Sequence, residues 1–419
     1  MKLAKKFYRL PLSFDVEKLA EEIAQFSEFD WQDHPQNFTG NSALLLVAVD
    51  GDPTNDSLQG SMAMTPHLKR CEYLQQVLTT FKSTIGRTRL MRLAGENQVK
   101  PHTDQNYYWL QRVRIHIPIV TYPEVTFYCG NDKVNMKAGE CWIFNTWLPH
   151  KVENPNDKER IHLVIDTVGS VEFWDLVEKQ DFQREIAYEK GKQVELKTEK
   201  VNAPIVMSPW EQKELFNFFL EDLQEVPENN KEIIESLSYK FRQINRKWHN
   251  IWVSYGTHSS GWQEYQKAVE EIINDLSPFA EKLQLANGVE FFEGIKTSVL
   301  RDMLNFQLVK KGEIAQKITP QAKTANMMQL QMISAALPKF DRPIFIVSAP
   351  RSGSTFLFET LSKCSVWTIG GESHEIFENI PQLQPEKKGY KSNALDVADA
   401  DFATSVNFTP ISLYFNSSR

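Results

Sequence analysis

The sequence reads RVRIHIPIV at residues 112–120 and RIHLVIDT at residues 160–167. Because successive side chains of a β-strand point to opposite faces, each stretch would present one apolar face and one polar face. The polar positions are Arg112, Arg114 and His116 in the first stretch, and Arg160, His162 and Asp166 in the second. These polar faces either meet water or line a cavity. We expect a sheet that packs its apolar face outward and lines a cavity with its cationic face.

Other short runs of strand-forming residues occur throughout residues 1–170, at 43–49 (ALLLVAV), 125–128 and 141–144. Turns rich in glycine, proline, asparagine and aspartate separate these runs. No helical patterns of 10–15 residues lie between the later runs, which favours antiparallel pairing over β–α–β units. We therefore expect residues 1–170 to form one β-domain.

A candidate metal site consists of His102, Asp104 and His150. His102 and Asp104 are two positions apart, so in an extended chain their side chains point to the same side. Two imidazoles and one carboxylate form the facial ligand set of non-haem Fe(II) oxygenases. Zinc accepts the same ligands, so their types alone leave the metal open. Arg160 follows in the next predicted strand and suits a dicarboxylate, because guanidinium and carboxylate pair through two parallel hydrogen bonds.

These motifs together resemble the aspartyl/asparaginyl β-hydroxylase family, which includes bacterial free-proline hydroxylases. The resemblance covers roughly residues 30–170 and rests on RLMRLA from Arg89, KPHTD from Lys100, RIHIP from Arg114, GECWIFN from Gly139, and the pair His150 and Arg160. It implies a double-stranded β-helix (jelly-roll) fold and a 2-oxoglutarate-dependent dioxygenase that hydroxylates an amino acid or a peptidyl residue of the Asp, Asn or Pro type, with O₂ as oxidant.

The resemblance also implies roles for individual residues. His102 and His150 would bind Fe(II), with Asp104 as the acidic ligand, and these three would form the catalytic centre. Arg160 would bind the distal carboxylate of 2-oxoglutarate, with help from Arg114 and His116. The vertebrate aspartyl/asparaginyl enzymes lack the acidic ligand, so Asp104 places this chain nearer the proline hydroxylases. Three further arginines, Arg87, Arg89 and Arg92, could bind a substrate carboxylate or lie at the surface.

The composition excludes several other classes of protein. The chain has 419 residues and a formal net charge of −7, which argues against a general nucleic-acid-binding surface. We find no apolar run long enough to span a membrane and no secretory signal, so no membrane partner is expected. Four cysteines lie scattered without CxxC spacing, which argues against a disulfide scaffold and favours the reducing cytoplasm. The oligomeric state is left open.

Residues 171–335 change to helical patterning and form a predicted helical connector. Ser208-Pro-Trp-Glu211 is typical of a helix start, with a capping serine and proline at the first helical position. Residues 233–252 and 262–285 also predict helices. No motif in this region indicates chemistry, and its aromatic residues are expected to be core.

Residues 336–419 predict an incomplete α/β segment. A short buried-strand run at 344–348 leads into Ala349-Pro-Arg-Ser-Gly-Ser-Thr355 and then a helical stretch. This strand, loop and helix resemble the phosphosulfate-binding loop of P-loop-like sulfotransferases, which use 3′-phosphoadenylyl sulfate. The resemblance implies cofactor contacts from Arg351, Ser352, Gly353, Ser354 and Thr355. The remaining residues are too few for a complete nucleotide-binding fold.

The preferred interpretation is therefore a dioxygenase β-domain, a helical connector and the start of a sulfotransferase-like domain. Two alternatives stay open. The first is a sulfotransferase-led fusion fragment whose β-domain only binds, and the second is a non-catalytic sensor of 2-oxoglutarate and metal. A zinc hydrolase is less favoured, because no HExxH-type glutamate accompanies the metal residues. The substrate and its site of attack are left open.

Overall fold

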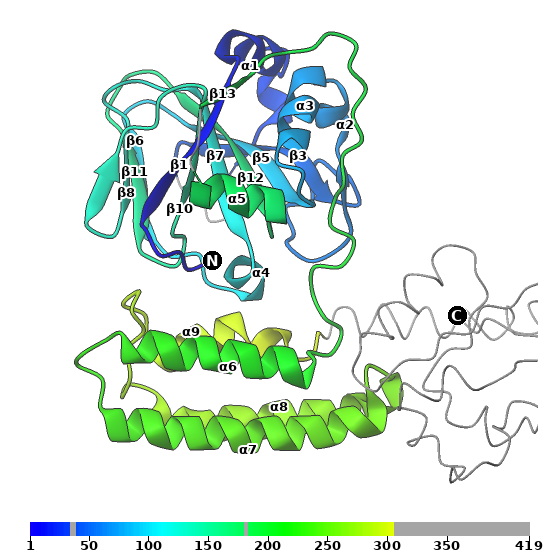
Figure 1. Cartoon of the computed structure of the whole chain (residues 1–419), viewed down its shortest axis with the longest axis vertical. Coiled ribbons are helices and arrows are strands. Elements are labelled where there is room, and N and C mark those ends of the chain that lie inside the picture. Colours follow the sequence, from blue (N-terminus) through cyan, green and yellow to red (C-terminus); the bar gives the residue numbers. More distant parts are fainter. Residues whose placement is uncertain (34–38, 180–182, 306–419) are drawn as a thin grey trace, which may run out of the picture. The chain divides into compact units, whose positions relative to one another are not determined.

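The computed structural model describes residues 1–33, 39–179 and 183–305 (Figure 1). The chain divides into two compact units, residues 1–317 and residues 318–419, and only the first contains described residues. The predicted sulfotransferase-like segment 336–419, including its loop residues 351–355, lies outside the described residues. The same holds for the last part of the predicted helical connector.

A nine-stranded sheet forms the larger part of the β-domain. Its order is β13 (Arg184–Ile186), β1 (Phe7–Phe14), β10 (Glu140–Phe144), β7 (Val113–Val120), β12 (Arg160–Thr167), β5 (Ile85–Leu93), β3 (Asn41–Val49) and β2 (Gln32–Asp33), with β4 (Met62–Met64) paired to β3. Among the described strands of this sheet, every pair is antiparallel except β1 with β13. The expected antiparallel pairing is confirmed.

A second, four-stranded sheet is ordered β6 (Asn97–His102), β11 (His150–Asn154), β8 (Thr126–Cys129) and β9 (Asp132–Val134). Apolar side chains from both sheets share one cluster, with Leu93 and Phe144 from the large sheet and Phe127 and Val152 from the small one. Two antiparallel sheets packed against each other are consistent with the predicted jelly roll.

Helices cover the other face of the large sheet, in agreement with the predicted apolar face. They are α1 (Val16–Ile23), α2 (Pro66–Lys69), α3 (Glu72–Thr80) and α5 (Val171–Lys179). Ile115 and Ile117 of β7 and Leu163 of β12 are fully buried in the core that these helices share. Alternation at these strands therefore leaves Arg114, His116 and Arg160 on the opposite face, toward the second sheet.

The predicted helical region is present as α6 (Pro209–Gln224), α7 (Lys231–Tyr255), α8 (Trp262–Leu276) and α9 (Phe291–Ser298). Ser208 caps α6 as predicted, because its hydroxyl accepts a hydrogen bond of 3.2 Å from the Glu211 N–H. The helix expected to reach residue 285 ends at Leu276, since Pro278 has no N–H to continue it. No helix among the described residues is long and apolar enough to cross a membrane.

The remaining short elements connect these layers. Helix α4 (Tyr107–Leu110) lies between β6 and β7, and single 3₁₀ turns occur at Glu28–Asp30, Ser259–Gly261, Ser277–Phe279 and Leu300–Asp302.

The chain beyond residue 170 first continues along the β-domain. Strand β13 pairs with β1, and Thr198 bridges to Ile85 at the start of β5. The Arg112 Nε atom donates a hydrogen bond of 2.7 Å to the Glu199 carboxylate. Arg112 was expected on the cationic face of β7, but it precedes the first residue of the strand and anchors this returning segment instead.

The helical region packs directly on the β-domain. Tyr107 and Trp147 of the β-domain belong to the same buried core as α6 to α9. The Trp147 indole N–H donates to a carboxylate oxygen of Asp222 on α6 at 2.8 Å, and the Ala286 N–H donates to the other oxygen at 2.8 Å. Lys2 Nζ lies 2.6 Å from the same fully buried carboxylate. Asp222 therefore holds the two regions together.

Replacing Asp222 with alanine is expected to lower stability by about 3–5 kcal/mol, because it leaves buried donors without an acceptor. The matched control is Glu225→Ala, which removes the exposed second partner of Lys2 and should cost less than about 1 kcal/mol. The urea midpoint of tryptophan fluorescence in the full chain measures both changes. Equal midpoints for the two variants would contradict the role assigned to Asp222.

Candidate metal centre

Two paired strands bring the predicted histidines together. His102 is the last residue of β6, His150 is the first residue of β11, and the two are direct partners in the antiparallel register of these strands. Asp104 follows two residues after His102, where its backbone N–H donates to the Thr146 carbonyl at 3.2 Å. Ligands separated by almost 50 positions along the chain thus meet because one strand pair fixes their register.

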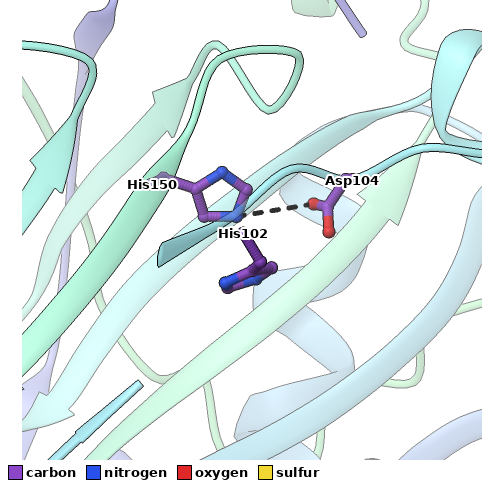
Figure 2. A group of neighbouring side chains, drawn as sticks. All are labelled: His102, Asp104 and His150. Atoms are coloured by element: carbon purple, nitrogen blue, oxygen red, sulfur yellow. Dashed lines mark ion pairs between the residues drawn. The ribbon is translucent and has the colours of Figure 1, made fainter. Parts of the chain in front are cut away.

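The three side chains form a group with the geometry of a metal site. One ligand atom from each of His102, Asp104 and His150 can be chosen so that all lie within 4.8 Å of one another. The two imidazole centroids are 4.3 Å apart, and His150 Nε2 is 3.9 Å from Asp104 Oδ2. Figure 2 shows the His150 ring facing the carboxylate of Asp104, with His102 beside them.

Backbone carbonyl groups orient both imidazoles in the same way. His102 Nδ1 lies 2.9 Å from the Lys100 carbonyl oxygen, and His150 Nδ1 lies 2.9 Å from the Leu148 carbonyl oxygen. A carbonyl oxygen only accepts, so Nδ1 carries the proton and Nε2 carries the lone pair in each neutral ring. Metal-binding histidines are held by such contacts at the second ring nitrogen. The donor set therefore fits a metal ion.

Arg114 controls the charge of the acidic ligand. Its Nη1 donates to Asp104 Oδ2 at 2.8 Å, and its Nε donates to Asp166 at 3.0 Å. Burial alone would raise the pKa of Asp104, but the charge of Arg114, with a smaller contribution from His150, lowers that pKa to about 2. Burial also opposes the charge on Arg114, yet Asp104 and Asp166 together raise its pKa.

The same environment keeps the imidazoles of His150 and His116 neutral. Burial lowers the pKa of His150 to about 4, although the carboxylate of Asp104 acts in the opposite direction. Burial, and then the charge of Arg160, lowers the pKa of His116 well below its usual range. An ionised carboxylate and a neutral imidazole are the protonation states in which these side chains bind metals.

The candidate metal ligands lie on the wall of a cavity of about 1060 Å³ that Arg160 and His116 also line. Only 4% of the Arg160 surface is exposed, its Nε atom has no hydrogen-bond partner, and no carboxylate of the described residues forms an ion pair with it. Burial lowers the pKa of Arg160 to about 9. A buried guanidinium without a counter-ion favours a bound anion, and a carboxylate can pair with it through two parallel hydrogen bonds.

The other predicted residues differ in whether they face the cavity and in which partners they bind. His116 faces the cavity, where Nε2 has no partner and Nδ1 lies 3.5 Å from His162 Nδ1. Arg114, expected beside the co-substrate, is held by the two carboxylates Asp104 and Asp166. Arg92 is bound by Glu28 through contacts of 2.7 and 2.8 Å and does not line the cavity.

Several cavity residues were not predicted from the sequence. Asp56 reaches the cavity from the loop between β3 and β4, and it pairs with Arg87 and Arg89. Arg301, Asp302 and Asn305 reach the same cavity from the end of the helical region. The period of a strand identifies which arginines face inward, but no local pattern identifies a partner that arrives from a distant loop.

Two family models match separate parts of the chain. Residues 18–169 match the family described as aspartyl/asparaginyl beta-hydroxylase, and residues 343–412 match the sulfotransferase family. Both resemblances read from the motifs are thereby confirmed. The first match spans the strands that carry His102, Asp104, His150 and Arg160, while the second lies outside the described residues.

Solved structures give weaker similarities. An oxidoreductase of the 2OG-Fe(II) oxygenase family from Burkholderia pseudomallei is 11% identical over 36% of this chain and 77% of its own, with a TM-score of 0.27. HygX from Streptomyces hygroscopicus, with nickel and 2-oxoglutarate bound, is 10% identical over 40% and 84%, with a TM-score of 0.29. A prolyl-4-hydroxylase from Pseudomonas putida is 12% identical over 39% and 92%, with a TM-score of 0.27. These TM-scores are too low to support any conclusion about the function of this chain.

Replacing His150 with alanine should weaken Mn(II) binding about 100-fold or more, since even outer-shell changes alter metal affinity 10–100-fold. Calorimetric titration of the full chain with Mn(II) measures the loss. The control is His258→Ala, which removes an exposed histidine that caps a turn of the helical region. Unchanged affinity in the His150 variant would refute the ligand assignment.

Proposed function

We propose that this chain is an Fe(II)- and 2-oxoglutarate-dependent hydroxylase. The observation that carries the proposal is one cavity lined by two oriented imidazoles, a carboxylate and a buried guanidinium that has no counter-ion among the described residues. The hydroxylase family model over residues 18–169 supports the same class of reaction.

Each residue has a defined role in this proposal. His102, Asp104 and His150 would hold the metal on one side, which leaves positions open for 2-oxoglutarate and O₂. The bound metal, together with 2-oxoglutarate and O₂, would supply the oxidising power that converts a C–H bond of the substrate into C–OH, with succinate and carbon dioxide as by-products. Arg114 would keep the carboxylate of Asp104 ionised and oriented.

Arg160 would bind the distal carboxylate of 2-oxoglutarate. Its strand position is fixed by pairing with Leu93 of β5 on one side, and its guanidinium is buried, so the ion pair would form in a medium of low dielectric constant. Neutral His116 lies on the next strand of the same sheet and offers an unpartnered Nε2 atom for a further hydrogen bond.

The substrate would be an amino acid or a peptidyl residue of the Asp, Asn or Pro type. A cavity of about 1060 Å³ has room for a small diacid and for a second small molecule or side chain. The chain would act by positioning one C–H bond of that substrate next to the metal. The cytoplasmic location expected from the cysteine pattern stays a prediction, and the described cysteines Cys71, Cys129 and Cys141 are free.

The direct test is release of succinate from 2-oxoglutarate by the purified full chain, with and without Fe(II). Turnover that depends on Fe(II) and is lost in His150→Ala supports the hydroxylase and argues against a sensor that only binds. No turnover in any condition, with Mn(II) and 2-oxoglutarate still bound, would favour the sensor.

Replacing Arg160 with glutamine should raise KM for 2-oxoglutarate about tenfold or more, because a charge-assisted bidentate pair is lost. kcat at saturating 2-oxoglutarate should change much less, since Arg160 is not one of the candidate metal ligands. Steady-state succinate release measures both constants, with Arg184→Gln on the exposed edge strand β13 as control. A lower kcat with unchanged KM would contradict this role for Arg160.

A sulfotransferase-led protein is the second candidate, because residues 343–412 match that family. This candidate assigns 3′-phosphoadenylyl sulfate to the loop at residues 351–355. Calorimetry of the full chain with adenosine 3′,5′-bisphosphate tests it independently of the hydroxylase. A zinc hydrolase with a glutamate base has less support, since no glutamate lines the cavity within the described ranges.

A further inference from the structure

Two adjacent arginines on the cavity wall share a single carboxylate. Arg87 and Arg89 of β5 are 4% and 6% exposed, and both face the cavity. Arg87 Nη1 is 2.8 Å from Asp56 Oδ1, and Arg89 Nη1 is 3.2 Å from Asp56 Oδ2. Asp56 comes from the loop between β3 and β4, and its side chain is 19% exposed. Arg87 Nε also lies 3.8 Å from Asp166 Oδ2, whereas Asp56 is the carboxylate that both arginines share.

A bound metal would leave this group of charges short of one anion. Arg87, Arg89 and Arg114 are matched by the three carboxylates of Asp56, Asp104 and Asp166. Under the proposed function, Asp104 also becomes a metal ligand, so its charge is shared with the metal. The three guanidiniums would then rely mainly on two carboxylates, and the cavity next to Arg87 and Arg89 would favour one further anion.

Unpartnered hydrogen-bond donors mark the same part of the cavity. Arg87 Nε, Gln105 Nε2, Trp109 Nε1 and Arg114 Nη2 are buried and have no hydrogen-bond partner among the described residues. All four residues line the cavity, and the Trp109 ring lies 5.5 Å from the Arg87 guanidinium and 5.1 Å from that of Arg114. Every one of these atoms can donate, so the ligand that satisfies them must be rich in oxygen acceptors.

This group is separate from the Arg160 site. In the ladder of β12 and β5, Arg160 pairs with Leu93, whereas Arg89 pairs with Val164. Four residues of strand separate these two levels, which is about 13 Å along the sheet. The two sites are therefore separate at the level of the backbone, and the five-carbon diacid is assigned to Arg160 and a different anion to Arg87 and Arg89.

The loop that carries Asp56 is attached to the helical region. Gln59 donates a hydrogen bond to Asp302 and accepts one of 2.6 Å from Asn305 Nδ2. Asp302 and Asn305 themselves line the cavity, as does the neighbouring Arg301. The helical region thus forms one wall of the cavity and fixes one end of the Asp56 loop, so it is more than a connector.

We propose that Arg87 and Arg89 form the binding site for an oxyanion of the substrate, and that the Asp56 carboxylate occupies this site until the substrate replaces it. This inference rests on the proposed function and adds to it a substrate class, namely a molecule that carries a carboxylate, phosphate or sulfate group away from the hydroxylated carbon. Exchange of one anion for another keeps both guanidiniums paired throughout. Asp56 then competes with the substrate and lowers its apparent affinity.

Three variants of the full chain, each loaded with Mn(II) and 2-oxoglutarate, test the exchange. The probes are L-aspartate, O-phospho-L-serine and inorganic sulfate, with L-asparagine as the neutral match for L-aspartate, and calorimetry measures their binding. Asp56→Asn should lower the dissociation constant of the best anionic probe about threefold or more, because the internal competitor is weakened. Arg89→Gln should raise the dissociation constant of the same probe about tenfold or more, because a charge-assisted contact is lost.

Arg92→Gln is the matched control, since Arg92 lies on the same strand but is held by Glu28 away from the cavity. It should bind every probe as the wild type does. Preference for one probe identifies the type of oxyanion. The inference is overturned if Asp56→Asn fails to tighten any anionic probe, if Arg89→Gln binds as wild type, or if no anionic probe binds better than L-asparagine.

Loading with Mn(II) and 2-oxoglutarate separates this inference from the proposed function. If the wild-type chain binds neither Mn(II) nor 2-oxoglutarate, the hydroxylase proposal fails. The proposed anion site at Arg87 and Arg89 then loses its basis. If the chain binds both and releases succinate but shows none of the expected anion preferences, the hydroxylase proposal stands. Only the role proposed for Arg87, Arg89 and Asp56 is then refuted. Retained Mn(II) and 2-oxoglutarate binding in each variant shows that it is folded.

Discussion

Four guanidinium groups are buried on one face of the large β-sheet, and their need for anionic partners determines how the cavity is built. A buried charge is tolerated only with a partner, and three of the four have carboxylates within the fold. Arg114 links Asp104 to Asp166, while Arg87 and Arg89 share Asp56. Arg160 alone among the four has no ion-pair partner among the described residues. Arg160 is therefore the position in the cavity at which a ligand carboxylate would supply the missing counter-ion.

The two-residue period of the strands made much of this arrangement predictable. The apolar side chains of β7 and β12 pack under α1, α3 and α5, and the basic side chains face the second sheet, as the alternation in RVRIHIPIV and RIHLVIDT indicates. The spacing of His102 and Asp104 likewise placed both on one side of the chain. These features are local in sequence, because each depends only on neighbouring residues of one strand.

What could not be predicted depends on contacts between distant segments. Asp56 is 31 positions from its partner Arg87, and Gln59 is 243 positions from Asp302, and no periodicity relates such pairs. Helix α1 was missed although Asp15 caps it, its carboxylate accepting from the Lys18 N–H at 2.9 Å. Leu19 and Ile23 supply its buried face, but eight residues are too few for a clear helical period.

The helical region and the β-domain both contribute residues to the lining of one cavity. Asp222 of α6 binds the indole of Trp147, three residues before the candidate metal ligand His150, so the helices are attached next to the candidate metal centre. The last 3₁₀ turn, Leu300–Asp302, and the residues that follow it supply Asp302 and Asn305 to the lining of the cavity. The candidate metal ligands come from a pair of strands and the loop after it, whereas Asp302 and Asn305 line the same cavity without belonging to the ligand group. Under the proposed function, substitutions at Asp302 and Asn305 would change which molecule is accepted more readily than they would change the arrangement of the metal ligands.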